Sequence, residues 1–224
     1  RGIGADGMLA IEPANNGGDF RMRYYNADGN EAEMCGNGAR CLARYVTDRQ
    51  LTGKNPIRVK TMNRVIDLEM RDNHSVRVDM GVPQLEPADI PFKAEQKAQL
   101  YSIDVAGTEY DIAAVSMGNP HAVMLVDDVD TAPLESIGPQ LETHGRFPND
   151  VNVGFMQIID RQNIKLRVFE RGVGETQACG SGACAAAVAA IQQDLVDFAV
   201  TIHVNGGDLH IDWQGENETL LMTG

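Results

Sequence analysis

Long apolar stretches are missing from this sequence. The longest uninterrupted one, residues 183–191, is about half of the roughly 20 residues that a membrane-spanning helix needs, so no transmembrane helix is expected. Basic residues are also scarce, since 19 Lys and Arg face 32 Asp and Glu and the formal charge is −13. Non-specific binding to nucleic acid or to an anionic membrane requires basic surface, so the charge balance argues against both partners.

Cysteine is rare as well, with four residues in 224. They form neither a CxxC pair nor a Cys/His cluster at zinc spacing, which argues against a structural metal site. Cysteines this sparse also make a disulfide framework a poor interpretation. The chain is long enough to bury a core without disulfides or a structural metal, and its composition is that of an ordinary globular protein.

Two of the four cysteines open nearly identical phrases. The run CGNGA begins at Cys35 and the run CGSGA begins at Cys179, which is 179 − 35 = 144 residues later. At the same offset three further pairs match: Arg23 with Arg167, Tyr25 with Phe169, and Glu31 with Glu175.

A repeat of this period indicates a duplicated domain rather than a solenoid. We expect residues 1–82 and 83–224 to be the two copies, with a proline-containing linker at residues 82–93. A functional cleft is expected where two such copies meet.

Strand patterns dominate the chain, and helices are few. Alternating or β-branched segments predict strands at residues 8–11, 20–25, 57–61, 65–70, 76–80, 113–115, 122–125, 155–159, 165–170, 200–204, 209–213 and 220–222. Helices are predicted after the two glycine phrases, at residues 38–50 and 182–195, and a third at residues 130–142. The second helix is rich in alanine, which suits a helix packed closely inside a cupped sheet.

Each repeated cysteine therefore lies at a turn from a strand into a helix. The first N–H groups of a helix lack intrahelical partners and can hold a carboxylate. The same position should lower the thiol pKa from its usual value of about 8.5. Two opposed thiols suit the inversion of a stereocentre, because one removes a proton as a base while the other delivers a proton to the opposite face.

Four motifs carry a resemblance to the diaminopimelate epimerase family. They are NADG at residues 26–29, MCGNGARC at 34–41, SMGNPH at 116–121 and ERGVGETQACGSGAC at 170–184. The resemblance runs along the whole chain. It implies an α/β (α+β) fold of two similar domains, each a mixed β-sheet wrapped around a central helix.

The same resemblance implies an activity and its setting. The expected enzyme is an isomerase that interconverts LL- and meso-2,6-diaminopimelate with no cofactor and no metal. It would serve lysine and peptidoglycan synthesis in the bacterial cytoplasm, act on a small-molecule substrate and form a homodimer.

The resemblance also assigns roles to individual residues. Cys35 and Cys179 match the catalytic cysteines, and His121 and Glu170 match residues that assist proton transfer. The positions that match substrate-binding residues are Asn26, Gly36, Asn37, Asn119, Asn152, Glu170, Arg171, Gly180 and Ser181. An arginine suits the distal carboxylate through two parallel hydrogen bonds. Cys41 and Cys184, on the helices, are expected to be small buried fillers.

The chain departs from the family pattern at Gly7, where the family often has Gln. It begins with RGIG, without Met and within a motif, and it stops at Gly224 before the family's usual final strand. We therefore expect it to be part of a longer protein.

Two alternatives remain at this point. One is a related two-cysteine racemase acting on proline, hydroxyproline or another amino acid. The other is a non-catalytic or redox protein that uses Cys35 and Cys179 as a thiol switch.

Overall fold

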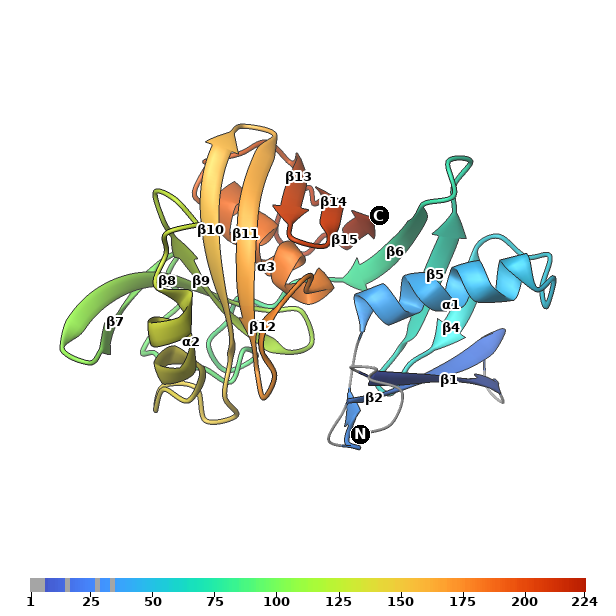
Figure 1. The fold of residues 1–224 in the computed structure, drawn as a ribbon, viewed down its shortest axis with the longest axis horizontal. Coiled ribbons are helices and arrows are strands. Elements are labelled where there is room, and N and C mark those ends of the chain that lie inside the picture. The colour runs from blue at the N-terminus through green and yellow to red at the C-terminus, as the bar shows by residue number, and fades with distance from the viewer. Residues whose placement is uncertain (1–6, 15–16, 27–28, 33–34) are drawn as a thin grey trace. The chain divides into compact units, whose positions relative to one another are not determined.

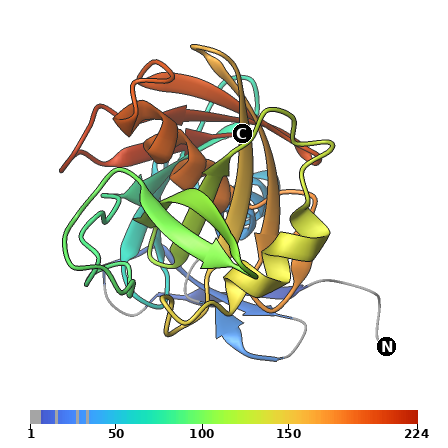
Figure 2. The same ribbon diagram turned by 90° about the vertical axis from the view of Figure 1, so that its left-hand side faces the viewer.

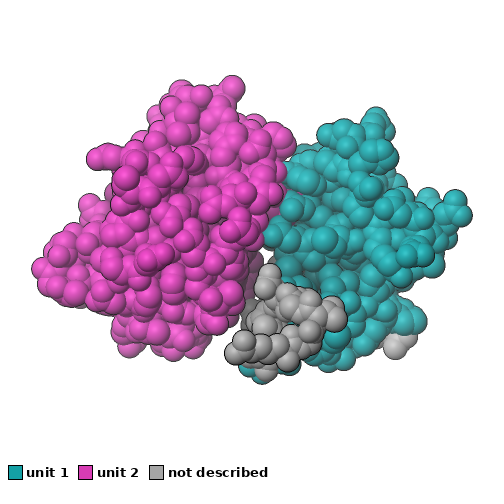
Figure 3. Space-filling model, viewed as in Figure 1, with its two compact units in different colours: residues 1–80, 223–224 teal, residues 81–222 magenta. Residues whose placement is uncertain are grey.

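The computed structural model describes residues 7–14, 17–26, 29–32 and 35–224 of the chain (Figure 1). The chain divides into two compact units (Figure 3). Unit 1 comprises Arg1–Met80 with Thr223–Gly224, and unit 2 comprises Gly81–Met222.

Unit 1 is a small mixed sheet with one helix. Its strands lie in the order β1-β2-β4-β5-β6, and β3 pairs with β2. They are β1 (Gly7–Pro13), β2 (Phe20–Asn26), β3 (Glu31–Ala32), β4 (Ile57–Lys60), β5 (Val65–Met70) and β6 (Val76–Gly81). Strands β2 and β4 are parallel and the other neighbouring pairs are antiparallel. Helix α1 (Gly36–Asp48) packs on β2 and β5 through Ala39, Leu42, Ala43 and Val46, which are fully buried.

Unit 2 is a larger mixed sheet with two helices. Its strands lie in the order β15-β14-β13-β11-β10-β9-β8-β7, and β12 pairs with β11. They are β7 (Tyr101–Val105), β8 (Thr108–Ser116), β9 (Pro120–Leu125), β10 (Asn152–Asp160), β11 (Asn163–Glu170), β12 (Gly174–Thr176), β13 (Ala199–Val204), β14 (Gly207–Asp212) and β15 (Leu220–Thr223). The helices are α2 (Leu134–Glu142) and α3 (Gly180–Gln192).

Helix α3 lies inside the curve of the unit 2 strands (Figures 1 and 2). It contacts β8, β9, β10, β11, β13 and β14, and nearly all of its side chains are buried. Small side chains make this possible, because alanine lets strands approach the helix backbone from every side. Helix α2 contacts β7, β10, β11 and β12, so β10 and β11 contact both helices. There Leu134, Ile137 and Leu141 join a core with Ile103 and Phe155.

The repeat seen in the sequence is also present in the element positions. Helices α1 and α3 have the same length and begin and end 144 residues apart. In each unit, the strand before the helix runs parallel to the strand after it, β2 to β4 and β11 to β13. The short strands also match in register, since Tyr25 faces Glu31 and Phe169 faces Glu175.

The mixed α/β fold class predicted from the sequence is confirmed. Every predicted strand and helix is present, whereas β3, β7 and β12 were not predicted. Strands β3 and β12 are too short to carry a pattern, but β7 has one, because its alternate residues Tyr101, Ile103 and Val105 are buried. Across the described part of the chain, no helix combines the length and the apolarity needed to cross a membrane.

The predicted linker, residues 82–93, lies entirely in unit 2. Ile90 and Phe92 are buried in the core of that unit, and Gln84 exchanges backbone hydrogen bonds with Ser116. The units separate after Met80, and Gly224 exchanges hydrogen bonds with Val76 in unit 1.

Candidate active site

Both repeated cysteines are the N-cap residues of their helices. Each has an extended backbone conformation, and its sulfur accepts a hydrogen bond from the third helical N–H group. The distances are 3.2 Å from Gly38 N to Cys35 Sγ and 3.4 Å from Gly182 N to Cys179 Sγ. A side chain that accepts from this N–H is how Ser or Asp normally caps a helix. This explains why the helices begin at Gly36 and Gly180, two residues earlier than predicted.

The surroundings of Cys179 favour the protonated thiol. Burial raises its pKa strongly, and the negative charge of Glu170 raises the pKa further. Hydrogen bonds from Ser181, with its Oγ 3.6 Å from the sulfur, and from the Gly182 N–H lower the pKa but do not offset burial. The expectation of a lowered thiol pKa is therefore wrong for Cys179, because the dipole of the helix is outweighed by the loss of water.

Glu170 is the last residue of β11, and Arg171 begins the turn that connects β11 to β12. Gly172 and Gly174 have positive φ angles of 74° and 97°, which reverse the chain within a few residues. Glu170 accepts a hydrogen bond from Thr176 Oγ1 at 2.5 Å, and Arg171 Nη1 donates to the Asn149 carbonyl at 2.9 Å. A carboxylate and a guanidinium therefore stand on consecutive residues here, each with a partner of its own. Thr176 had not been singled out in the sequence.

Asn152, at the start of β10, connects this turn to a second one. It is only 4 % exposed. Its Nδ2 donates to the Pro120 carbonyl at 3.0 Å, and its Oδ1 accepts from the Arg171 N–H at 3.1 Å. Both ends of the side chain thus bind protein backbone. A substrate contact by Asn152 stays a prediction, whereas its hydrogen bonds to the Pro120 carbonyl and the Arg171 N–H are observed.

His121 is the second residue of β9, directly after the turn at residues 117–119, and it is buried and neutral. Burial lowers its pKa from 6.5 to about 3, and the positive charge of Arg171 acts in the same direction. Its Nε2 lies 3.2 Å from Asn119 Oδ1. Because an amide oxygen only accepts, Nε2 carries the hydrogen and Nδ1 is the unprotonated nitrogen.

In unit 2 the predicted site residues form one group. Contacts connect Cys179, Ser181, Glu170, Arg171 and Asn152, and Asn152 reaches the start of β9 through the Pro120 carbonyl. In unit 1, Cys35, Gly36 and Asn37 are consecutive at the start of α1, and Asn37 Oδ1 accepts from Arg40 Nη2 at 3.0 Å. Asn26 ends β2 opposite Gly7, and its side chain lies outside the described residues.

The space that a side chain at position 7 would need is occupied by Tyr24. A Cβ added to Gly7 would lie 2.5 Å from Tyr24 Cζ and 2.9 Å from the Tyr25 carbonyl oxygen, closer than real Cβ contacts. A tyrosine on the neighbouring strand therefore accounts for the glycine at a position where the resemblance led us to expect Gln.

We expect Gly7→Gln to destabilise the protein by about 1–3 kcal/mol, the usual cost of overpacking. Adding Tyr24→Ala to this variant should recover part of the loss, because it removes the contacts with the ring while the contact with the Tyr25 carbonyl stays. Urea unfolding of the single and double variants measures both effects. A Gly7→Gln protein as stable as the parent would show that Tyr24 does not restrict this position.

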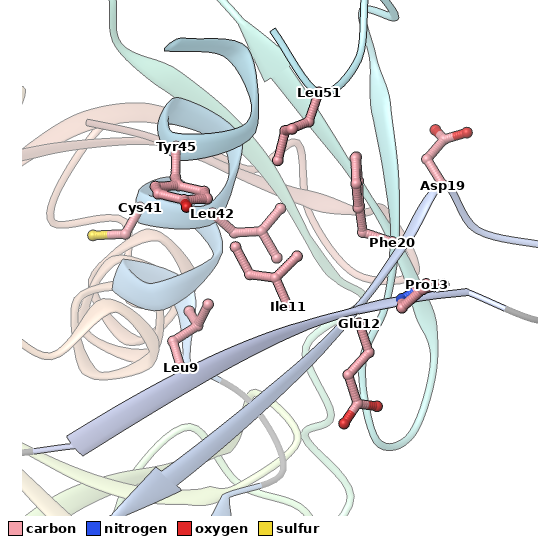
Figure 4. A pocket seen from close by; sticks show the side chains of 10 residues that line it. All are labelled: Leu9, Ile11, Glu12, Pro13, Asp19, Phe20, Cys41, Leu42, Tyr45 and Leu51. Atoms are coloured by element: carbon pink, nitrogen blue, oxygen red, sulfur yellow. The ribbon is translucent and has the colours of Figure 1, made fainter. Parts of the chain in front are cut away.

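A mainly apolar groove of about 820 Å³ lies in unit 1 between α1 and strands β1 and β2 (Figure 4). Cys41, Tyr45 and Leu51 line it, and Cys41 is exposed. The prediction that Cys41 is a buried filler is therefore wrong, whereas Cys184 is buried as predicted. The physical reason is that β8 and β9 cover α3 in unit 2, whereas the matching face of α1 borders the groove.

None of the four cysteines forms a disulfide. Within the described ranges, His, Cys, Asp and Glu side chains form no group of three or more that could hold a metal ion. The side chains gathered in unit 2 are instead suited to hold charged organic groups and to move a proton.

Comparison with known proteins agrees with the resemblance noted in the sequence. The family model described as diaminopimelate epimerase matches residues 1–86 and 113–224. The chain is 56 % identical over 224 residues to the diaminopimelate epimerase of Pseudomonas fluorescens (strain Pf0-1) and 55 % identical to that of Ectopseudomonas mendocina (strain ymp). Each alignment covers 100 % of this chain and 81 % of the relative.

Solved structures share the fold at low identity. A hydroxyproline epimerase from Agrobacterium vitis, with bound trans-4-hydroxy-L-proline, matches with a TM-score of 0.69 and 15 % identity. A probable proline racemase from Agrobacterium radiobacter K84 matches with a TM-score of 0.69 and 14 % identity. Each alignment covers 97 % of this chain and 72 % of the other. At such identities the likeness concerns the fold alone, whereas the family match and the close relatives show that this chain belongs to the diaminopimelate epimerase family.

Proposed function

We propose that the chain interconverts LL- and meso-2,6-diaminopimelate by a two-base mechanism without a cofactor, with Cys35 and Cys179 on opposite faces of the α-carbon. One observation carries the proposal: each cysteine caps an equivalent helix, at the same position of a 144-residue repeat. Inversion requires a base on one face and an acid on the other, and two equivalent thiols supply both. We also propose that the two copies are the domains 1–82 and 83–224.

The site residues suit a substrate with two ammonium and two carboxylate groups. The N–H groups at the starts of α1 and α3, at Gly36–Asn37 and Gly180–Ser181, would hold the α-carboxylate and stabilise the charge that grows on it as the proton leaves. The Arg171 guanidinium would bind the distal carboxylate in a bidentate manner. Glu170 and the Asn26, Asn119 and Asn152 amide oxygens would accept hydrogen bonds from the ammonium groups.

The raised pKa of Cys179 supports a starting state in which Cys179 is the thiol that delivers a proton. Inversion by two bases then requires Cys35 to remove the α-proton from the other face. After one turnover Cys35 carries the proton and Cys179 has lost one, so the reverse reaction uses the opposite roles. Glu170 keeps Cys179 protonated through its negative charge, and the neutral His121 orients Asn119 rather than carrying charge.

Neither alternative is favoured. The relatives that are 55–56 % identical are diaminopimelate epimerases, whereas the proline and hydroxyproline racemase structures are 14–15 % identical. A reversible disulfide between Cys35 and Cys179 would remove both proton carriers, so oxidation would inactivate this enzyme. The family places the reaction in lysine biosynthesis. A peptidoglycan role, the bacterial cytoplasm and a homodimer are further parts of the proposal.

The decisive experiment is turnover of LL-diaminopimelate in heavy water by the full-length protein. Because the proton comes from a thiol that exchanges with solvent, deuterium should appear at the inverted α-carbon of the meso product. Proton NMR and mass spectrometry measure its position and amount. Product that retains the original hydrogen would contradict the two-base mechanism, and racemisation of proline in place of diaminopimelate would contradict the substrate.

A further inference from the structure

The same ion pair occurs in both copies of the repeat, with the same atoms in contact. In unit 1, Arg23 Nε and Nη2 donate to Glu31 Oε1 and Oε2 at 3.1 and 2.8 Å. In unit 2, Arg167 Nε and Nη2 donate to Glu175 Oε1 and Oε2 at 2.7 and 2.9 Å. Both pairs are therefore bidentate, the strongest and most directional form of an ion pair between side chains.

Each pair joins a central strand to the short strand that leads to the cysteine. Glu31 is in β3 and faces Tyr25 of β2, and Glu175 is in β12 and faces Phe169 of β11. The arginine is two residues before that facing residue, so it reaches the glutamate diagonally across the strand pair. In both units the glutamate precedes the N-cap cysteine by four residues. The ion pair thus fixes the chain just before it turns into the helix.

The Arg167–Glu175 pair is more enclosed than the Arg161–Asp197 pair of the same unit. The side chains of Arg167 and Glu175 are 18 % and 28 % exposed, whereas those of Arg161 and Asp197 are 57 % and 44 % exposed. The hydrogen bonds from arginine lower the pKa of Glu175, and the same holds for Glu31 in unit 1. Both glutamates therefore remain charged partners throughout the neutral pH range.

Unit 2 shows how closely the segment between glutamate and cysteine is held. Gly206 N donates to the Gln177 carbonyl at 2.7 Å. A Cβ at Gly206 would lie 3.1 Å from both Ala178 Cβ and Gln177 O, so the chain passes there in close contact. Arg167 also donates through Nη1 to the Val129 carbonyl at 2.8 Å, which anchors the ion pair in the body of the unit.

We propose that the two Arg–Glu pairs are positioning residues for the two cysteines, one pair for each thiol. Each pair fixes the segment that ends at the N-cap cysteine. The sulfur is then held in its hydrogen bond with the helix N–H group and at the position from which it exchanges a proton with the α-carbon. The inference rests on the proposed function of Cys35 and Cys179. Its physical basis is that a displacement of about 1 Å of a reacting group can cost about 10²-fold in rate.

The test replaces each glutamate by alanine and measures both activity and thiol reactivity. Glu31→Ala and Glu175→Ala should each lower kcat by about 10- to 100-fold with a smaller change in KM. Asp79→Ala and Asp197→Ala, which remove ion pairs to Arg64 and Arg161 in units 1 and 2, are the matched controls and should keep kcat within about two-fold.

Thiol reactivity separates positioning from general stability. Iodoacetamide labelling followed by peptide mass spectrometry gives a rate for each cysteine. Glu31→Ala should change the rate at Cys35 by about five-fold or more and leave Cys179 within about two-fold, and Glu175→Ala should do the reverse. If an alanine variant does not fold, Glu31→Gln or Glu175→Gln replaces it, because glutamine has the same shape and keeps one acceptor.

Equal changes at both cysteines, or none at either, would overturn the proposal and assign the pairs to stability alone. Failure of the proposed function has a different signature. In that case protein lacking Cys35 or Cys179 would remain active, whatever the labelling rates of the glutamate variants are.

Discussion

Cys179→Ala and Cys35→Ala should each lower the rate of epimerisation by about 10³-fold or more, within the range that proton transfer by a positioned group contributes. Each variant lacks either the acid or the base, so a proton leaves or arrives on one face only and the centre is not inverted. The measurement is kcat for LL-diaminopimelate, followed by chiral separation of the products. Full activity in either variant would contradict the mechanism.

The capping role of the cysteines calls for a second substitution. Alanine also removes the N-cap hydrogen bond, at a cost of about 1 kcal/mol, so a loss of activity could arise from a disturbed helix start. Serine is a good N-cap but a far weaker proton carrier near neutral pH. Cys179→Ser should therefore fold as stably as the parent and remain inactive. An active Cys179→Ser variant would show that Cys179 serves only to cap the helix. Cys41→Ser, which replaces an exposed thiol, is the control and should stay active.

The second large effect is a loss of stability in acid caused by His121. Its pKa is about 3 in the folded protein and 6.5 in an unfolded chain, so between these values only the unfolded chain binds the proton. The contribution to stability is therefore fully present above pH 6.5 and decreases as the pH falls toward 3. Between these two pKa values the contribution amounts to about 5 kcal/mol, of which about 2 kcal/mol is lost between pH 7 and pH 5.

Urea unfolding at pH 7 and pH 5 measures this contribution. Carboxylates also titrate in acid, so the informative quantity is the difference between the parent and His121→Gln. The variant should lose about 2 kcal/mol less than the parent between the two pH values. His210→Gln, at an exposed histidine, should follow the parent. Parallel pH profiles for the parent and His121→Gln would show that His121 is solvated or already charged in the folded state.

Much of the architecture could be predicted because its signals are local. Alternation of apolar residues predicts strands, and the phrase CG-N/S-GA predicts a helix start. The missed strands β3 and β12 span only two and three residues, too few for any period to appear. The cysteine pair, the 144-residue repeat and the family were all readable in the sequence, since each depends on the order of residues alone.

The protonation of the site could not be predicted in this way. A cysteine at a helix N-terminus should have a lowered pKa, yet burial and Glu170 raise the pKa of Cys179. His121 follows a turn motif typical of exposed positions, yet it is buried and neutral. Asn152 binds two backbone groups from turns that are more than 15 residues away in sequence.

By itself, the sequence predicted which residues would carry the chemistry: two cysteines at equivalent helix starts, a Glu-Arg pair, asparagines and a histidine. Only the tertiary structure decided what state those residues are in. It exposes Cys41 while burying Cys184, it closes Cys179 off from water, and it places the bidentate Arg–Glu pairs before both thiols. The reason is that the burial and the pKa of a side chain depend on which strands, distant in sequence, pack around it, and a local sequence pattern does not specify those strands.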